Sequence, residues 1–337
     1  MKVLRSTALS LLAVVLALFG VPSAAAAQSP PVVSGGVPPT FAQLLTATND
    51  GGLFHALRSE NGAWTPIGNV KLVAGDPGYV YDAAEMVSLG QLHVVVATSL
   101  GLYHAIRDNS GAWTAFGDVF NEAGNPGYVL NVAAADVGGS LHVLVSTSNG
   151  GLYHTIRDPN GAWTLFDDVS TESGGPGYVT DIGAGGTYNE LQMVVTNSYG
   201  RVYHAIRHAD GTWTRLGDVK QMTGNPGWVV RSAAAVVNND LHVVLCTDAG
   251  GVFHAVRDYY GTWTRVGDVK QVTGDPGRVS DVAVTGIYGV AQIAVATEYG
   301  GVFHAIRRYD GTWTPMGNVK QVTGDPGAVS RVSIAVQ

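Results

Sequence analysis

"LHVLVSTSNGGLYHTIRDPNGAWTLFDDV", residues 141–169, contains the pattern that decides the fold. Variants of this stretch occur six times along the chain, and consecutive copies are 49 or 50 residues apart. A period near 50 residues with glycine-rich turns and short apolar runs is typical of a β-propeller. The repeat is marked by six histidines and six tryptophans: His55, His104, His154, His204, His254 and His304, with Trp64, Trp113, Trp163, Trp213, Trp263 and Trp313.

Each repeat contains four apolar runs. In the copy quoted above and the residues before it, the runs are "YVLNVAAADV", "LHVLVSTS", "GLYHTIRD" and "AWTLFDDV". The turn signals "GGS", "NGG" and "PNG" separate them. No window shows a helical period, so we predict an all-β chain with four antiparallel strands per repeat.

The ends of the repeat array give the number of blades. The array opens at Phe41 with the second, third and fourth strands only, and it finishes with a lone first strand, "AVSRVSIAVQ". We therefore predict a six-bladed β-propeller over residues 41–337. Its ring is closed by the C-terminal strand, which joins the N-terminal blade. The first strands are rich in small residues, as expected where six strands crowd around an axis.

The N-terminal residues have the pattern of a targeting segment. Lys2 and Arg5 precede a mostly apolar run, Ala8–Val21, that is too short to span a bilayer comfortably. Small residues follow at the spacing that a signal peptidase accepts, so we predict a signal peptide over residues 1–27 and a secreted protein. An uncleaved membrane anchor is the alternative. Residues 28–40 are expected to be a Pro/Gly-rich tether.

The charge balance excludes some partners. The chain has a net charge of −7, which becomes −9 without Lys2 and Arg5. An acidic chain is a poor partner for nucleic acid or an anionic membrane, so neither nucleic-acid binding nor membrane insertion is expected. Cys246 is the single cysteine, so no internal disulfide can form. The pattern does not predict the oligomeric state, and we expect no cofactor.

The turns predict how the strands pair. Across the "NGG" turn, strand two pairs with strand three so that His142 faces Asp158, His242 faces Asp258 and His93 faces Asp108. In the other repeats Gln43, Gln192 and Gln292 then face Ser59, His208 and Arg308. The next loop has three residues ending in Gly, which suits a type I turn followed by a left-handed Gly. That register places the Arg of strand three directly opposite the Trp of strand four.

The Arg–Trp pairs are the candidate carbohydrate-binding residues. An indole face accepts sugar C–H groups, and a guanidinium donates several hydrogen bonds to ring hydroxyls. The same pair could instead stiffen each outer hairpin and seal one blade against the next, and the sequence leaves both interpretations open. The pairs are Arg58 with Trp64, Arg107 with Trp113, Arg157 with Trp163, Arg207 with Trp213, Arg257 with Trp263, and Arg307 with Trp313.

Other repeated positions favour structural roles. The repeated His is expected to be half-buried and hydrogen-bonded between blades. In the register above, His93 and His104 lie about 13 Å apart, and no metal site is expected. The "GDPG" motif predicts a type II turn. Residues that end strand four could accept a hydrogen bond from a sugar hydroxyl, but they are expected to cap their own loops: Asn69, Asp118, Asp168, Asp218, Asp268 and Asn318. The most varied repeated position is either a set of stacking platforms or an exposed strand start: Tyr79, Tyr128, Tyr178, Trp228, Arg278 and Ala328.

Signals for catalysis are weak. "HADGTWT" is similar to the Asp-containing hairpin of sialidases but lacks the Ser and the spacing of that motif. Glycoside hydrolysis needs a unique acid and a unique nucleophile or base, which break symmetry. Here nearly every notable residue occurs six times, and Glu85 and Glu298 have no obvious partner.

The repeat quoted at the start resembles those of bacterial propeller lectins of the Photorhabdus lectin type, and more loosely the tectonins. It looks closest to secreted actinobacterial versions with "HAIR" and "GDV" repeats. The resemblance covers residues 41–337 and implies binding of fucose or related sugars in pockets between blades. Fucose lectins of the six-bladed fungal type use an Arg, a Glu and an aromatic residue. In this chain the Arg and the Trp recur but no Glu does.

Together, these observations predict a secreted propeller that binds glycans of cell surfaces or polysaccharides without catalysis, through several equivalent sites. A protein-interaction scaffold that uses the ring faces is the first alternative. A sialidase-like glycoside hydrolase is the second.

Overall fold

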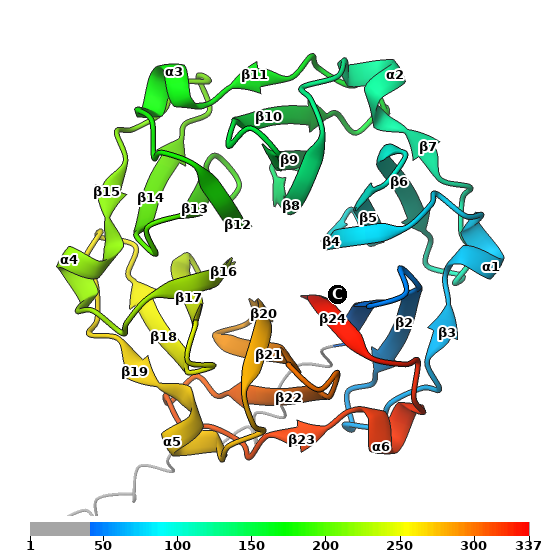
Figure 1. The fold of residues 1–337 in the computed structure, drawn as a ribbon, viewed down its shortest axis with the longest axis vertical. Helices are drawn as coiled ribbons and strands as arrows, with labels where there is room; N and C mark the ends of the chain where they lie inside the picture. Colours follow the sequence, from blue (N-terminus) through cyan, green and yellow to red (C-terminus); the bar gives the residue numbers. More distant parts are fainter. Residues whose placement is uncertain (1–40, 337) are drawn as a thin grey trace, which may run out of the picture. The chain divides into compact units, whose positions relative to one another are not determined.

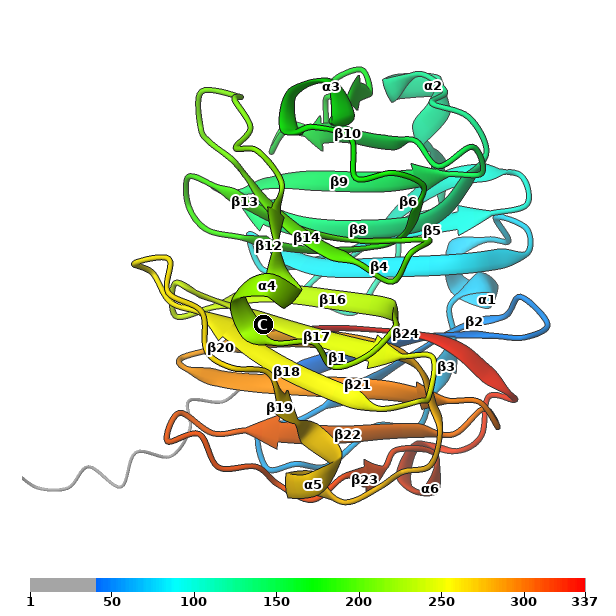
Figure 2. The same ribbon diagram turned by 60° about the vertical axis from the view of Figure 1, so that its left-hand side comes forward.

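The computed structural model describes residues 41–336, which form six four-stranded antiparallel sheets set around an axis like the blades of a propeller (Figure 1). This confirms the predicted six-bladed architecture. Figure 2 shows the long strands of successive blades crossing the ring from one face to the other. The predicted signal peptide and tether, and Gln337, lie outside the described residues.

Each blade has its strands in sequence order from the axis outward, apart from the first blade. The innermost strands are β4 (Val80–Ser88), β8 (Val129–Val137), β12 (Val179–Gly186), β16 (Val229–Val237), β20 (Val279–Ile287) and β24 (Val329–Val336). The second strands are β1 (Ala42–Thr48), β5 (Gln91–Thr98), β9 (Ser140–Thr147), β13 (Leu191–Asn197), β17 (Asp240–Thr247) and β21 (Val290–Thr297).

The third strands are β2 (Leu53–Arg58), β6 (Gly101–Arg107), β10 (Leu152–Arg157), β14 (Val202–Arg207), β18 (Val252–Arg257) and β22 (Val302–Arg307). The outer strands have two residues each: β3 (Gly68–Asn69), β7 (Gly117–Asp118), β11 (Asp167–Asp168), β15 (Gly217–Asp218), β19 (Gly267–Asp268) and β23 (Gly317–Asn318). We number the blades in chain order, so that blade 1 contains β1 and blade 2 contains β4.

The ring closes where the last strand pairs with the first. In blade 1 the sheet order is β24-β1-β2-β3, and β24 pairs antiparallel with β1 from Ala42 opposite Val336 to Thr48 opposite Val329. Two segments that are almost 300 residues apart in the chain thus share one sheet, as predicted.

The predicted pairing of strands two and three is wrong by two residues. His142 faces Ile156, not Asp158, and the same shift holds in every blade, for example Gln43 opposite Leu57 and His93 opposite Ile106. In blade 3 the N–H of Thr147 donates to the carbonyl of Gly151 (3.1 Å), so the loop is 148–150 and not "NGG" at 149–151. Moving a hairpin loop by one residue moves the register by two.

The outer part of each blade differs from the predicted fourth strand. Its middle leaves the sheet to bond the preceding blade: Phe166 N–H donates to the carbonyl of Ala123 (3.0 Å). The equivalent N–H groups of Ile67, Phe116, Leu216, Val266 and Met316 do the same at 2.8–3.0 Å. Each blade is therefore fastened to its neighbour by a backbone hydrogen bond at the rim.

Six one-turn helices at the rim were not predicted, because four or five residues are too few to show a helical period. They are α1 (Lys71–Ala74), α2 (Val119–Ala123), α3 (Ser170–Ser173), α4 (Val219–Thr223), α5 (Val269–Thr273) and α6 (Lys320–Thr323). The Asp or Asn that ends each outer strand accepts a backbone N–H from the helix that follows, as from Phe120 to Asp118 (2.9 Å). The predicted capping role is confirmed.

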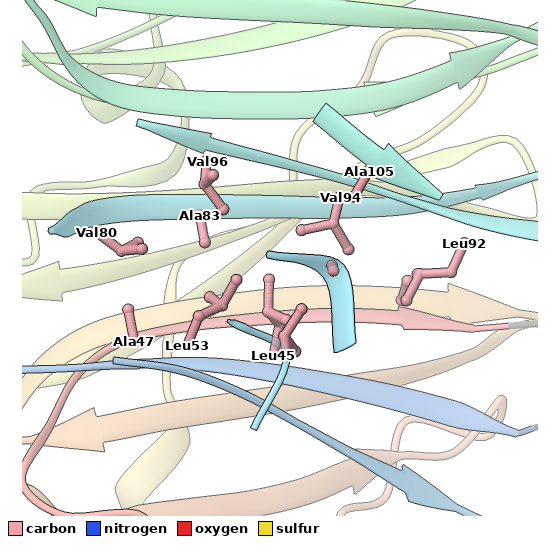
Figure 3. Packing of buried hydrophobic residues seen from close by; sticks show 12 residues of the cluster. Leu45, Ala47, Leu53, Val80, Ala83, Leu92, Val94, Val96 and Ala105 are labelled. Carbon is pink, nitrogen blue, oxygen red and sulfur yellow. The ribbon is translucent and has the colours of Figure 1, made fainter. Parts of the chain in front are cut away.

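The hydrophobic core lies between blades rather than in a single centre. Figure 3 shows the cluster between blades 1 and 2, where Leu45 and Leu53 face Val94 and Val96 across the interface. Near the axis the chains approach closely. A Cβ added to Gly183 would lie 2.7 Å from the backbone nitrogen of Ala234, so the small residues of the inner strands are required there. No helix in residues 41–336 has the length and apolarity needed to cross a bilayer.

Candidate functional site

Each blade carries one Arg and one Trp directly opposite each other at its outer hairpin. All six predicted pairs, from Arg58 with Trp64 to Arg307 with Trp313, are confirmed as antiparallel bridges. In blade 3 the N–H of Gly161 donates to the carbonyl of Asp158 (3.0 Å), and Gly161 has φ +97°. This is the predicted turn with a left-handed glycine.

The guanidinium of each pair lies against the turn glycine. A Cβ built on Gly161 would lie 2.9 Å from Nη2 of Arg157. The equivalent separations in the other blades are 2.8–3.4 Å, at Gly62, Gly111, Gly211, Gly261 and Gly311. The glycine thus provides both the backbone conformation of the turn and the space that the Arg side chain occupies.

The indole of each pair lies at the seam, by which we mean the interface between two adjacent blades. Trp113 of blade 2 and His55 of blade 1 form an edge-to-face contact, with ring centroids 5.6 Å apart and an interplanar angle of 84°. All six seams repeat this contact at 5.4–5.8 Å and 81–84°. The tryptophans are only partly buried. Each indole therefore packs one part against the preceding blade and leaves another part exposed, so the Trp has a structural role whatever else it does.

The six guanidiniums keep their hydrogen-bond donors free. They are partly buried, yet within residues 41–336 none of the six makes an ion pair or a side-chain hydrogen bond. Burial lowers the pKa of five of them from its ordinary value, as at Arg58, although an Arg remains charged in proteins. A desolvated cation without a partner is costly unless something else binds it.

The pair in blade 4 differs from the others in its charged neighbours. Burial lowers the pKa of Arg207, and the negative charges of Glu172 and Asp167 in blade 3 oppose that shift. This seam therefore brings an Arg, a Trp and a carboxylate into one region. Comparison of the six repeats missed the carboxylate, because Glu172 belongs to the helix of another blade.

The repeated His is part of a buried pair in every blade. In blades 2, 3 and 5 it contacts a second His from strand two, as in His93 Nδ1 to His104 Nε2 at 3.0 Å. In blades 1, 4 and 6 its partner is a Gln Oε1 at 2.8–3.1 Å. The predicted separation of 13 Å between His93 and His104 is wrong, because it rested on the incorrect register. The predicted inter-blade hydrogen bond is also wrong. The bond lies within a blade, and the inter-blade contact is with the Trp.

Burial keeps these histidines neutral. It lowers the pKa of His55, His104, His204 and His304 to about 3, and the positive charge of an Arg from the next blade adds to the shift. The pKa of His93, His142 and His242 falls to about 4 for the same reasons. Within the part of the chain that the structure describes, no three His, Cys, Asp or Glu side chains gather in a metal-binding arrangement.

Two cavities lie on the propeller axis, and neither is lined by the Arg–Trp pairs. The varied position near Tyr79 lies at one mouth of the axis. Its aromatic members, Tyr79, Tyr128, Tyr178 and Trp228, are 42–50% exposed. We call this end of the ring the tyrosine face.

Comparison with known proteins gives structural relatives only. No protein-family model matches the chain, and no curated protein sequence is similar to it. The fucose-specific lectin of Aleuria aurantia is similar with a TM-score of 0.64 and 17% identity, over 85% of this chain and 92% of the lectin. The chain has the fold of these lectins. AofleA of Arthrobotrys oligospora gives 0.59 and 14%, over 88% of each chain.

A bacterial protein has the same fold. The BP39L lectin of Burkholderia pseudomallei gives a TM-score of 0.54 and 15% identity, over 84% of this chain and 82% of the lectin. One of the fungal structures is described as a six-bladed β-propeller with a novel mode of fucose recognition. At these identities the similarity establishes a shared six-bladed architecture. What those lectins bind is a property of those lectins.

Proposed function

We propose that this chain is a secreted, multivalent glycan-binding propeller whose sites lie at the seams, each built around one Arg–Trp pair. The observation that carries the proposal is the set of six partly buried guanidiniums that make no hydrogen bond or ion pair in the described residues, each opposite a partly exposed indole. Sugar hydroxyls would satisfy these donors, and sugar C–H groups would cover the indole.

Two further points support this proposal. Several solved structures with this fold are described as lectins, including a fucose-specific one. The sixfold repetition also favours recognition over turnover, because a glycosidase needs one dissimilar pair of carboxyl groups. Six shallow sites on one rigid ring would act together on a sugar-coated surface, so that avidity exceeds the affinity of one site. We expect the Photorhabdus lectin type to be the nearest functional group, as the repeat pattern predicts.

The test compares two variants on a glycan array and in sedimentation with cell-wall polysaccharide. In the first variant all six paired arginines are changed to Gln. In the control, four exposed arginines outside the pairs are changed to Gln: Arg201, Arg215, Arg265 and Arg308. We expect the first variant to lose surface binding and the control to keep it, with both folded by circular dichroism.

Two results would contradict the proposal. One is the absence of any glycan ligand for the unaltered chain. The other is equal loss of binding in the two variants, which would point to net charge and not to the pairs. A protein-interaction scaffold would instead capture a partner from culture supernatant that free sugar does not elute.

A further inference from the structure

The third residues of the six innermost strands together form a ring of polar side chains around the axis, which we call the polar ring. In blade order the six are Arg331, Asp82, Asn131, Asp181, Arg231 and Asp281. Neighbouring charges pair loosely: Arg331 Nε lies 3.5 Å from Asp82 Oδ1, and Arg231 lies 3.6 Å from both Asp181 and Asp281. The alternation of acid and base fails only at Asn131.

This ring separates two cavities with opposite charge. The larger, of about 640 Å³, is lined by the three aspartates of the ring together with Glu85 and Asp136, and by no Lys or Arg of the described chain. The smaller, of about 480 Å³, is lined by Arg231 and Arg331, and by no Asp or Glu of residues 41–336. The ring thus turns its guanidiniums toward the tyrosine face and its carboxyl groups away from it.

The aspartates are held in that direction by backbone groups. One carboxyl oxygen of each accepts an N–H from the next blade: Val132 to Asp82 (2.9 Å), Ser232 to Asp181 (2.5 Å) and Val332 to Asp281 (2.8 Å). Burial raises the pKa of Asp82 to about 6 and that of Asp181 to about 7. The positive charges of Arg331 and Arg231 oppose this rise.

Both guanidiniums have donors left for a ligand. Nη1 of Arg231 donates to the carbonyl of Thr180 (3.3 Å), and Nη1 of Arg331 donates to the carbonyl of Ser330 (3.0 Å). Neither makes a hydrogen bond through Nη2 among the described residues. Nε of Arg331 is buried beside Asp82 and is not available to a ligand. Two arginines with free, partly desolvated N–H groups at the floor of a cavity favour a planar anion such as a carboxylate.

The walls of the smaller cavity suit a sugar ring. Tyr79, Tyr81 and Tyr178 line it, and Tyr79 and Tyr81 contact each other with ring centroids 5.3 Å apart. The hydroxyls of Tyr79 and Tyr178 donate to the carbonyls of Asn49 (2.6 Å) and Ser148 (2.8 Å), which fixes both rings before any ligand arrives. Asn131, Thr180 and Ser330 complete the lining with neutral polar groups.

We propose that the smaller axial cavity is a single binding site for a carboxylate-bearing pyranose, that is, a hexuronic acid residue. The carboxylate would bind to Arg231 and Arg331. The aromatic ring of a tyrosine in the wall would pack against the C–H groups of the sugar, and the neutral polar groups would bind its hydroxyls. The site rests on the proposed function in that this chain recognises glycans, but it uses none of the Arg–Trp pairs. The seams provide up to six sites, and the axis provides one.

The test is calorimetric titration and saturation-transfer NMR with glucuronate and galacturonate, beside glucose, galactose and acetate. We expect uronate binding at one site per chain, with weaker binding of the neutral sugars and of acetate. The double variant R231K/R331K keeps the charge of the ring but loses the two-pronged geometry of the guanidinium. It should bind uronate at least about tenfold more weakly.

A second variant avoids the buried ring altogether. Tyr79→Ala with Tyr178→Ala removes two partly exposed walls of the cavity and should also weaken uronate binding. Its control is Tyr199→Ala, an exposed Tyr in the turn between β13 and β14 that does not line the cavity, which should leave binding unchanged.

The outcomes separate this site from the seams. Absence of uronate binding, equal binding of acetate, or binding that survives both the Lys and the Ala variants would overturn the axial site. The variant with all six paired arginines changed to Gln should still bind uronate. If the seams bind nothing and the uronate still binds at one site, the seam proposal fails and the axial site stands.

Discussion

The turn glycine of the outer hairpin shows how one small residue supports a candidate site. Gly161 has a left-handed φ of +97°, and the guanidinium of Arg157 occupies the space where a side chain would begin. A side chain at this position would meet both a backbone penalty and a steric one.

We therefore predict that Gly161→Ala lowers the free energy of unfolding by about 1–3 kcal/mol, and that it displaces Arg157. Urea denaturation measures the first effect. Gly175→Ala is the matched control, because no atom lies within 4 Å of its Cβ position and its φ is ordinary. Equal effects of the two substitutions would refute the argument.

Glu85 is a residue that breaks the symmetry of the ring, and one of its two carboxyl oxygens has no hydrogen-bond partner in the described residues. It is 5% exposed, Leu45 N–H donates to its Oε1 (3.1 Å), and its Oε2 has no hydrogen-bond partner in residues 41–336. Burial raises its pKa well above the ordinary value. The equivalent residues in the other blades are all apolar: Ala134, Ala184, Ala234, Val284 and Ile334.

Replacement of this carboxyl group should stabilise the fold. We expect Glu85→Val to raise the free energy of unfolding by about 1–2 kcal/mol at pH 7. A carboxyl group with a raised folded-state pKa stabilises the protein only below its unfolded pKa, and that contribution disappears as pH rises. The gain should therefore be larger at pH 8 than at pH 5 in denaturant titrations. The exposed Glu60→Val should show no such gain.

At the scale of the blade, the paired histidines make stability depend on pH. Nine buried histidines have a lowered pKa, chiefly because of burial. The unfolded chain binds more protons than the folded one below about pH 6.5, so this stability is present above that pH and is lost as pH falls toward 4. Five carboxyl groups act in the opposite direction, because their folded-state pKa values are raised, but they are fewer than the histidines: Asp82, Glu85, Asp136, Asp181 and Asp281.

We expect the melting temperature to fall steadily between pH 6.5 and pH 4.5. The chain itself supplies the matched variant, because three blades use Gln where the others use a second His. The triple variant His93→Gln, His142→Gln, His242→Gln should unfold with nearly the original free energy at pH 7.5 and lose less stability in acid. A melting temperature that is constant or rises on acidification would contradict this assignment.

The sequence predicts the blade well where the turn chemistry is unambiguous. The loop between strands three and four has one Gly in third place, and the Arg157–Trp163 register follows correctly. The loop between strands two and three contains two adjacent glycines, Gly150 and Gly151, and only Gly150 takes a positive φ. Sequence alone gives no reason to choose between them. The wrong choice gives a register in which His142 and His154 lie far apart, whereas in the structure their side chains are in contact.

The features of the candidate sites that the sequence did not reveal arise between blades. The rim hydrogen bonds and the His–Trp contacts join residues about 50 positions apart, and the polar ring joins residues from all six repeats. The ring had a signal nevertheless. The third residues of the innermost strands, such as Asp82 and Arg231, form a charged column in otherwise apolar segments. Pairing among them follows only once the strands are known to meet at one axis.

At the scale of the whole molecule, the ring depends on the pairing of β24 with β1. Deletion of residues 329–337 would leave β1 as an unpaired edge and open the seams on both sides of blade 1. We predict that this truncated chain loses cooperative thermal unfolding and aggregates, as measured by calorimetry and size-exclusion chromatography.

A rearranged chain provides the control for the truncation. Moving residues 326–337 in front of residue 41 through a short turn joins β24 to β1 as an ordinary hairpin, because Val336 already lies opposite Ala42. This permuted chain should recover cooperative unfolding. If it fails while the truncated chain unfolds normally, closure by β24 is unimportant.

The strand that completes blade 1 follows the other twenty-three along the chain, and this order has a consequence for biosynthesis. During synthesis, the strands of blades 2–6 would all have been made while blade 1 still lacks its innermost strand, β24. Until β24 has been made, β1 has an unpaired edge and the axial cavities lack the side chains that β24 contributes, among them Arg331. Any ligand that needs contributions from both β24 and β4, such as one held beside Arg331 and Tyr81, can bind only after β24 has been synthesised and has paired with β1.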